Sequence, residues 1–319
     1  MILALAITGP TASGKTALSL AVAKHFDAEI ISCDSMQIYR EMNIGTAKAT
    51  AEEMAVVPHH LVDIISPIES YSAQNYRSDA IKCAEDITRR GKLPIFVGGT
   101  GLYIDSVMRP NSSESPESND EYRESVLASI KTDEDITALW QRLKDVDPES
   151  AEKIHKNNVK RVIRALEIYD TTGKTKSQID RESLAQKSEV DVKMITIDFH
   201  DRELLYSRVN KRVDQMMEEG LVDEVRHLYD RGLLTGKTAS QAIGYKEIVE
   251  YLEGVCSLDQ AVENLKLATR RYAKRQLTWF RHEKDAAVIY ADTEDGRLKS
   301  SDEMRAEAIE ICRNLLSIK

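Results

Sequence analysis

The sequence has few cysteines and no long apolar stretch. Its four cysteines, Cys33, Cys83, Cys256 and Cys312, stand too far apart for paired zinc ligands and do not resemble a disulfide framework. The charge-free opening, Met1–Gly14, contains Gly and Pro and is shorter than the ~20 apolar residues that a membrane span requires. It also lacks the basic start and cleavage site of a signal peptide. We therefore predict ordinary thiols, no membrane partner and a cytoplasmic location.

Basic residues are in the minority. Lys and Arg number 44 against 53 Asp and Glu among 319 residues, which gives a net charge of −9. An evenly spread negative charge would argue against a nucleic-acid partner, but partners respond to the local field. Hydrophobic residues make up 42% of the chain and charged residues 30%, a composition that excludes wholesale disorder and fibrous repeats. At about 150 residues per domain, the length allows two domains.

Strand and helix patterns alternate in the first hundred residues. The apolar run Ile2–Ile7 is typical of a strand buried on both faces, and a helix pattern follows over Lys15–His25. Two further strands are predicted at Ala28–Cys33 and Leu93–Val97, with a helical stretch at Ser72–Arg90 between them. This alternation predicts an α/β fold built on a parallel sheet.

A polar, turn-rich segment at 110–120 predicts a boundary, and only helix patterns follow until a strand returns at Val192–Asp198. We therefore predict an α/β core, residues 1–115 and 190–319, interrupted by an all-helical insertion, residues 116–189. In the second part of the core we expect helices at Arg202–Met217, Leu221–Arg231, Gly244–Leu252, Leu258–His282 and Ser301–Leu316, and a strand at Val288–Tyr290.

The first predicted strand runs into a phosphate-binding motif. The pattern G-x-x-x-x-G-K-[ST] is met by Gly9, Pro10, Thr11, Ala12, Ser13, Gly14, Lys15 and Thr16, directly before a predicted helix. Backbone N–H groups of such a loop cradle a di- or triphosphate, Lys15 can neutralise it, and the Thr16 hydroxyl can help to hold Mg²⁺. A glycine-rich turn that merely links strand and helix is the alternative.

Asp34 follows the second predicted strand and should lie at the same sheet edge as this loop. Its carboxylate could accept a proton, ligate Mg²⁺ through water, or cap a following helix. The third strand ends in Gly98-Gly99 and lacks the Asp that supports Mg²⁺ in many P-loop ATPases, which weakens an ATP-hydrolysis interpretation. Those glycines either admit a backbone or flat ligand or form a tight turn. His59 and His60 lack a third ligand, so a structural role is favoured over a metal site.

Two segments break the acidic average. Residues 153–164 carry five basic residues and no acid, and helical periodicity places Lys160, Arg161 and Arg164 opposite an apolar face. The segment Arg270–Lys284 carries six basic residues against one Glu. A single such run is usually a solvated face, but two on an acidic chain favour a polyanionic partner.

Together these motifs resemble the tRNA dimethylallyltransferase family, also called isopentenyl-diphosphate:tRNA transferases. The resemblance runs nearly end to end. It rests on Gly9–Thr16, Asp34–Tyr39, Gly45–Lys48, Pro58–Asp63, Gly98–Tyr103, Lys160–Leu166, Arg212–Asp214, Gly220–Val225, Gln241–Tyr245, Tyr272–Gln276 and Trp279–Arg281.

The resemblance implies a P-loop NTPase-like core that holds dimethylallyl diphosphate, with Mg²⁺ on Thr16, and transfers the prenyl group to N6 of the adenosine 3′ of the tRNA anticodon. The N6 lone pair is delocalised into the ring, so a base is useful, and we assign that role to Asp34. The P-loop, Lys15 and either Arg208 or Arg212 would stabilise the departing diphosphate. We expect a monomer.

A stacked adenine must be flipped to reach such a pocket. The resemblance implies that the helical insertion grips the anticodon stem-loop. The residues that it assigns to tRNA are Asp34, Ser35, Met36, Gln37, Thr100, Arg123, Lys160, Arg161, Val162, Ile163, Arg164, Gln241, Ala242, Ile243, Gly244, Tyr245 and Lys246. Three other functions share some of these features: a small-molecule kinase, an RNA-binding protein without catalysis, and prenylation of a free adenine nucleotide, which would leave both basic segments unused.

Overall fold

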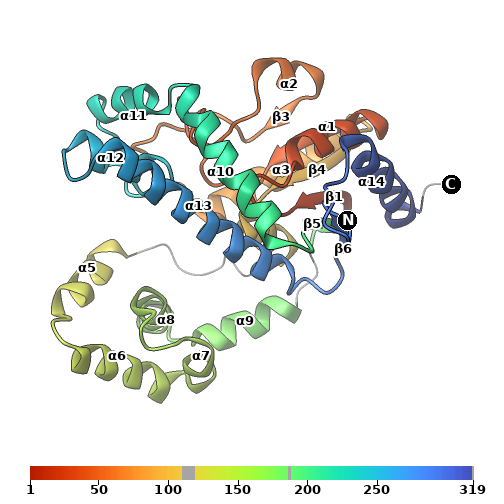
Figure 1. The fold of residues 1–319 in the computed structure, drawn as a ribbon. Helices are drawn as coiled ribbons and strands as arrows, with labels where there is room; N and C mark the ends of the chain where they lie inside the picture. Colours follow the sequence, from red (N-terminus) through yellow and green to blue (C-terminus); the bar gives the residue numbers. More distant parts are fainter. Residues whose placement is uncertain (110–118, 186–187, 318–319) are drawn as a thin grey trace. The chain divides into compact units, whose positions relative to one another are not determined.

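The computed structural model describes residues 1–109, 119–185 and 188–317. The chain forms two compact units, one made of Met1–Val107 and Glu189–Lys319 and the other of Met108–Ser188. Figure 1 shows the sheet in the first unit and only helices in the described part of the second. Most of the boundary predicted at 110–120 lies outside the described residues.

The first unit is built on a six-stranded parallel sheet with the order β3-β2-β4-β1-β5-β6, which confirms the predicted fold class. The central strand β1 pairs with β4 on one side and β5 on the other, and its residues Ala4 to Ile7 are fully buried. The strands are β1 Ile2–Thr8, β2 Ala28–Ser32, β3 His59–His60, β4 Leu93–Gly98, β5 Val190–Asp198 and β6 Ala287–Tyr290.

The parallel pairing brings the ends of β1, β2 and β4 to one edge of the sheet. Thr8 of β1 lies opposite Gly98 of β4, and Ser32 of β2 lies opposite Val97. The segments that follow these strands therefore leave the sheet side by side, as the switch-point rule for open α/β sheets requires. The site described below is built from them.

Helices of the first unit pack on this sheet through apolar side chains. One cluster joins β1 and β5 to Val22 of α1, Leu205 of α10, Leu277 of α13 and Ala308 of α14. The helices of this unit are α1 Lys15–His25, α2 Ala51–Val56, α3 Ala73–Arg89, α4 Gly101–Met108, α10 Arg202–Glu218, α11 Leu221–Asp230, α12 Tyr245–Leu252, α13 Leu258–Phe280 and α14 Ser301–Leu316, with short 3₁₀ turns at Leu233–Thr235 and Ala239–Gln241.

A second apolar cluster fixes the segment after β2. Its members Ile38, Tyr39 and Met42 are fully buried against Val225 of α11 and Ile248 of α12. Residues far apart in sequence thus hold the chain that carries Asp34 and its neighbours.

The second unit has its own small core. Leu143, Ala151, Val162 and Leu166 are buried together between its helices. Side chains cap three of the helix starts: Asn119 before α5, Thr132 before α6 and Asp147 before α7. The described helices are α5 Asp120–Ser129, α6 Asp133–Val146, α7 Pro148–Lys153, α8 Val159–Thr172 and α9 Lys176–Ala185.

Candidate active site

A cavity of about 920 Å³ opens in the sheet unit and is lined by the loop after β1, the segment after β2, α10 and α13. Although the whole chain is acidic, the charged residues that line this cavity are mostly basic, which favours an anionic ligand. The basic lining residues are Lys15, Arg208, Lys211, Arg212, Lys246, Arg271 and Arg275, and the acidic ones are Asp34 and Glu53.

The loop between β1 and α1 has the backbone of a phosphate-binding loop. Gly14 precedes α1 with a φ of +94°, a conformation that favours glycine, and the N–H of Ser13 donates to the carbonyl of Pro10. Two outside contacts hold the loop. The Nε of Arg208 donates to the Ala12 carbonyl at 2.7 Å, and the N–H of Thr11 donates to Gln276 Oε1 at 2.8 Å.

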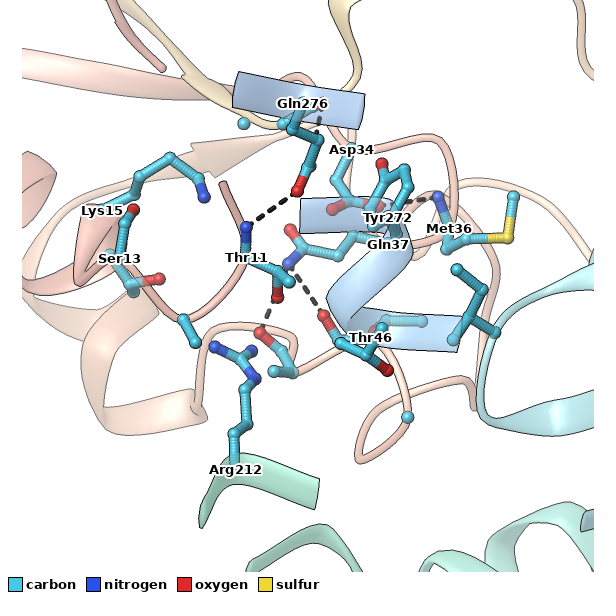
Figure 2. Close-up of a pocket in the computed structure, with 18 of the residues that line it drawn as sticks. Thr11, Ser13, Lys15, Asp34, Met36, Gln37, Thr46, Arg212, Tyr272 and Gln276 are labelled. Carbon is cyan, nitrogen blue, oxygen red and sulfur yellow. Dashed lines mark hydrogen bonds between the residues drawn. The ribbon is translucent and has the colours of Figure 1, made fainter. Parts of the chain in front are cut away.

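Three buried donors beside this loop either lack a hydrogen-bond partner or carry a charge that burial disfavours. The Ser13 hydroxyl and Arg212 Nε are buried and make no hydrogen bond with a described residue. Lys15 donates to the Pro10 carbonyl at 2.6 Å, and burial together with nearby Arg212 lowers its pKa to about 7, although Asp34 opposes the shift. An anion bound here would supply the missing partners. Figure 2 shows these groups around one space.

Asp34 begins a turn, so of its three possible roles the capping of a following helix is not the one observed. Residues 35–38 form turns, and Asp34 Oδ1 accepts the N–H of Met36 at 2.9 Å. Its other oxygen accepts no hydrogen bond within the described part of the chain, and Asp34 lines the cavity. Burial and the Asp34 charge both raise the pKa of Tyr272, which lies beside it in Figure 2. One carboxylate oxygen is thus structural, and the other is available for proton transfer.

The side chain of Gln37 is fixed at both ends of its amide. Its Oε1 accepts from Ser32 Oγ at 3.0 Å, and its Nε2 donates to the carbonyls of Thr46 and Ala47 at 3.3 Å each. Figure 2 shows the contact with Thr46. The amide orientation is therefore set by protein groups before any ligand binds.

The glycines after β4 serve close packing. A Cβ on Gly98 would lie 2.2 Å from the Cys33 carbonyl oxygen, and one on Gly99 would lie 2.0 Å from Gln276 Nε2. The Nε2 of Gln276 donates to the Gly99 carbonyl at 2.9 Å. Both interpretations left open hold in part: Gly98 admits the backbone of Cys33, and Gly99 allows close packing against Gln276 of α13.

Thr100, which follows these glycines, accepts the N–H of Ser35 at 3.0 Å, so it lies at the turn that Asp34 begins. Tyr272 and Gln276 also line the cavity, and sequence reasoning assigned them no role in the site. The signal was present, because Gln276 is a polar residue on the apolar face of the α13 pattern. Its buried amide joins the loop after β1 to the turn after β4.

The predicted segment 241–246 lies partly at the cavity. Gln241, Ala242, Ile243 and Lys246 line it, and both Gln241 and Lys246 are exposed. Tyr245 is fully buried, and Gly244 is buried too. Tyr245, at the start of α12, packs against α11 and the segment after β2, and the RNA contact of these two residues stays a prediction.

The remaining predicted tRNA residues lie in the helical unit. On α8, Lys160 and Arg161 are exposed, whereas the side chains of Val162 and Ile163 are buried in that unit; the RNA contact of these four residues stays a prediction.

Arg164 of the same helix does not stand free. Its Nη1 and the Nη2 of Arg123 bind Oε2 of the fully buried Glu167 at 2.8 and 2.9 Å. Burial alone would raise the pKa of Glu167, but the two arginines outweigh it and the pKa is lowered. Arg123 thus joins α5 to α8, whereas the ion pair of Arg164 with Glu167 lies within α8.

Comparison with known proteins gives one consistent result. The sequence profile of the family described as IPP transferase matches residues 37–283, and that described as isopentenyl transferase matches residues 2–63. A tRNA dimethylallyltransferase of Bacillus cereus is 50% identical over 302 residues, covering 94% of this chain and 92% of the relative. One from Thermoanaerobacter is 49% identical over 276 residues, covering 86% and 87%.

Solved structures agree. The tRNA isopentenylpyrophosphate transferase of Bacillus halodurans superposes with a TM-score of 0.73 at 43% identity, covering 99% of this chain and 97% of that one. A eukaryotic dimethylallyltransferase described as acting on tRNA superposes with a TM-score of 0.81 at 30% identity, covering 99% of this chain and 80% of that one.

Proposed function

Because the chain belongs to the IPP transferase family, we propose that it transfers a dimethylallyl group from dimethylallyl diphosphate to N6 of the adenosine 3′ of a tRNA anticodon. One observation carries the proposal: the same cavity is lined by the phosphate-binding loop and by Asp34. Its volume of about 920 Å³ lies within the range of sites that enclose a whole small ligand, roughly 300–1,000 Å³.

The basic end of the cavity suits the diphosphate. The Ser13 hydroxyl and Arg212 Nε make no hydrogen bond with a described residue, and burial lowers the pKa of Lys15 and of Arg212 although the charge of Asp34 opposes the shift. As the bond between the allylic carbon and oxygen breaks, negative charge grows on the leaving diphosphate, and these fixed donors would stabilise it. Arg208 supports the same loop through the Ala12 carbonyl. These contacts support Arg212 as the ligand of the diphosphate and Arg208 as a support of the loop.

The opposite side of the cavity suits the acceptor. Attack by N6 forms a C–N bond as the C–O bond breaks, and the amine must lose one proton. The available oxygen of Asp34 would take that proton, while its other oxygen keeps the turn. Apolar side chains of Val213, Met216 and Leu265 also line the cavity and could pack on the prenyl chain.

Mg²⁺ fits this site as a companion of the diphosphate. The described residues hold no group of three His, Cys, Asp or Glu side chains able to bind a metal. Thr16 and Asp34 nevertheless line the same cavity, and Mg²⁺ in proteins is commonly held by one or two protein oxygens together with substrate phosphates. When bound, Mg²⁺ would neutralise part of the diphosphate charge. Thr16 is the residue that we propose as its ligand.

RNA would be held mainly through its phosphates. Lys160 and Arg161 on α8 and Lys246 on α12 are exposed basic side chains of the kind that such contacts need. Among the described residues no helix is long and apolar enough to cross a bilayer. The cytoplasmic location and the monomeric state stay predictions.

The test is release of diphosphate by the pure protein with dimethylallyl diphosphate and Mg²⁺. We expect release with an anticodon stem-loop as acceptor and little with AMP. Release with AMP and none with RNA would replace the proposal by prenylation of a free nucleotide. ATP hydrolysis without prenyl transfer would point instead to the kinase class.

A further inference from the structure

The carboxylate of Glu224, outside the cavity, holds a loop that lines it. Oε2 of Glu224 accepts the N–H groups of Asn43 and Ile44 at 3.0 and 2.8 Å, and Oε1 accepts the N–H of Gly45 at 3.1 Å. The Tyr245 hydroxyl donates to the same Oε1 at 2.6 Å. Four donors thus converge on one carboxylate from α11, and an anion can accept all of them.

The loop has little room to move. A Cβ on Gly45 would lie 2.5 Å from the ring of Tyr245, so the backbone of the loop rests directly on that ring. From the other side, Lys48 donates to the Tyr39 carbonyl at 2.8 Å and to Asn43 Oδ1 at 2.9 Å. Glu224 and Lys48 therefore fix the two ends of the segment 43–48.

This segment supplies both carbonyls that hold Gln37. The Nε2 of Gln37 donates to Thr46 and Ala47, one and two residues beyond the last N–H that Glu224 accepts. A shift of the loop would release the amide, because the remaining contact to Ser32 is at the other end of the group. A continuous chain of hydrogen bonds thus runs from Glu224 through the loop to the side chain of Gln37.

We propose that Glu224 is a positioning residue for acceptor recognition, which acts by holding the loop 43–48 so that the amide of Gln37 faces the adenosine in one orientation. This inference rests on the proposed function and on the assignment of Gln37 to the tRNA, which the family resemblance implies. Glu224 does not line the cavity and is not expected to touch either substrate.

The substitution Glu224→Gln tests this with almost no change in shape. An amide NH₂ group cannot accept a hydrogen bond. In the variant, this group would therefore stand opposite N–H or O–H donors that a carboxylate oxygen accepts in the wild type. We expect a fall of about tenfold in kcat/KM for the anticodon stem-loop, the scale of a small misplacement of a binding group. The Kd for dimethylallyl diphosphate should stay unchanged, since its proposed ligands lie on the loop after β1 and on α10.

The decisive measurement is a double-mutant cycle with Gln37→Ala. If Glu224 acts through Gln37, Glu224→Gln should lower kcat/KM by less than about twofold in the Gln37→Ala background. Equal losses in both backgrounds would overturn the proposal, as would a wild-type value for Glu224→Gln alone. If the wild-type protein transfers nothing to RNA, the proposed function fails instead, so the two failures are distinguishable.

A matched control separates positioning from general loss of stability. Glu303→Gln alters a carboxylate on α14 that accepts the N–H of Ser300 at 2.7 Å and binds Arg297, away from the cavity lining. It should leave kcat/KM unchanged. If Glu224→Gln does not fold, Gly45→Ala pushes the same loop against Tyr245 without altering a charge. Its cycle with Gln37→Ala then separates the same two outcomes: a loss that depends on Gln37 supports the proposal, and an equal loss in both backgrounds overturns it.

Discussion

One carboxylate oxygen of Asp34 holds a turn, and we propose that the other accepts the proton from N6. Asn can still accept the Met36 N–H through its amide oxygen, but it cannot take a proton from N6. We therefore expect Asp34→Asn to slow transfer by about 100-fold or more while RNA binding changes little. Single-turnover transfer at saturating RNA checks this. A rate near that of the wild type would leave Asp34 with the turn alone.

The amine of Lys15 should change its charge when a diphosphate binds. Its pKa in the ligand-free protein is lowered to about 7, from an ordinary value of 10.5, chiefly because it is buried and also because Arg212 is near. Above pH 7 the amine is then largely neutral. A bound diphosphate favours the charged form and so raises this pKa. Affinity for diphosphate should therefore fall as pH rises above about 7.

Calorimetric titration with inorganic diphosphate at pH 8, in buffers of different ionisation enthalpy, measures this proton uptake. Since diphosphate itself titrates, the measure is the difference between the wild type and Lys15→Met, both at saturation. We expect the wild type to take up close to one proton more, about 0.9, from a pKa of about 7. Equal uptake by the two proteins would mean that Lys15 does not change its charge when diphosphate binds.

The same lowered pKa has a consequence for the ligand-free protein. Between pH 7 and 10.5 the unfolded chain binds a proton at Lys15 that the folded chain does not bind. Stability rises with pH wherever the unfolded state binds more protons. The ligand-free protein thus tolerates an unfavourable group that becomes favourable once the diphosphate is present.

At the scale of elements, the helix α8 carries one basic residue that is held in an ion pair and two that are exposed. Arg164 is engaged by Glu167, and its removal would destabilise the helical unit. Lys160 and Arg161 are exposed. We expect Lys160→Ala with Arg161→Ala to weaken stem-loop binding and to reduce the log–log salt slope by somewhat under one unit for each lost phosphate contact, about 0.7 to 0.9. The rate at saturating RNA should be kept.

The control for this pair is Lys82→Ala with Arg89→Ala on α3, two side chains more than 70% exposed that remove the same charge. The RNA affinity of both variants, measured over a range of salt concentrations, gives the two slopes to be compared. If the α8 pair binds with unchanged affinity and slope, that face is only solvated and the RNA lies elsewhere.

Elements with a strong period were predictable from the sequence, and several short ones were not. The sequence predicted α1 and α14 with their observed bounds: α14 has apolar residues at helical spacing and a cap at Ser300, whereas α1 has almost no such period and follows directly on the phosphate-binding motif. The sequence analysis did not identify α2 or α4, of six and eight residues, nor β3, of two. Such pieces contain too few residues for a period, and contacts distant in sequence stabilise them.

At the scale of the whole molecule, the parallel sheet could be predicted because apolar runs alternate with helices, and the edge holding Gly9–Thr16 and Asp34 follows from strand ends. The long-range hydrogen bonds that hold the loops at that edge could not be predicted. Thr11 meets Gln276 across 265 positions, and Gly45 meets Glu224 across 179. One sequence does not show which distant residues pair, because Gln276 and Glu224 lie in ordinary helix patterns and their partners Thr11 and Gly45 lie in loops.

The central claim is that the exocyclic N6 of one adenosine attacks the prenyl donor in this cavity. The most direct measurement is mass analysis of nuclease digests from two anticodon stem-loops after incubation with the protein, dimethylallyl diphosphate and Mg²⁺. One carries adenosine 3′ of the anticodon, and the other carries a purine without the exocyclic amine at that position. The account predicts one added C₅H₈ unit on that adenosine and none on the second RNA. Addition to the second RNA, or at another position of the first, would contradict it.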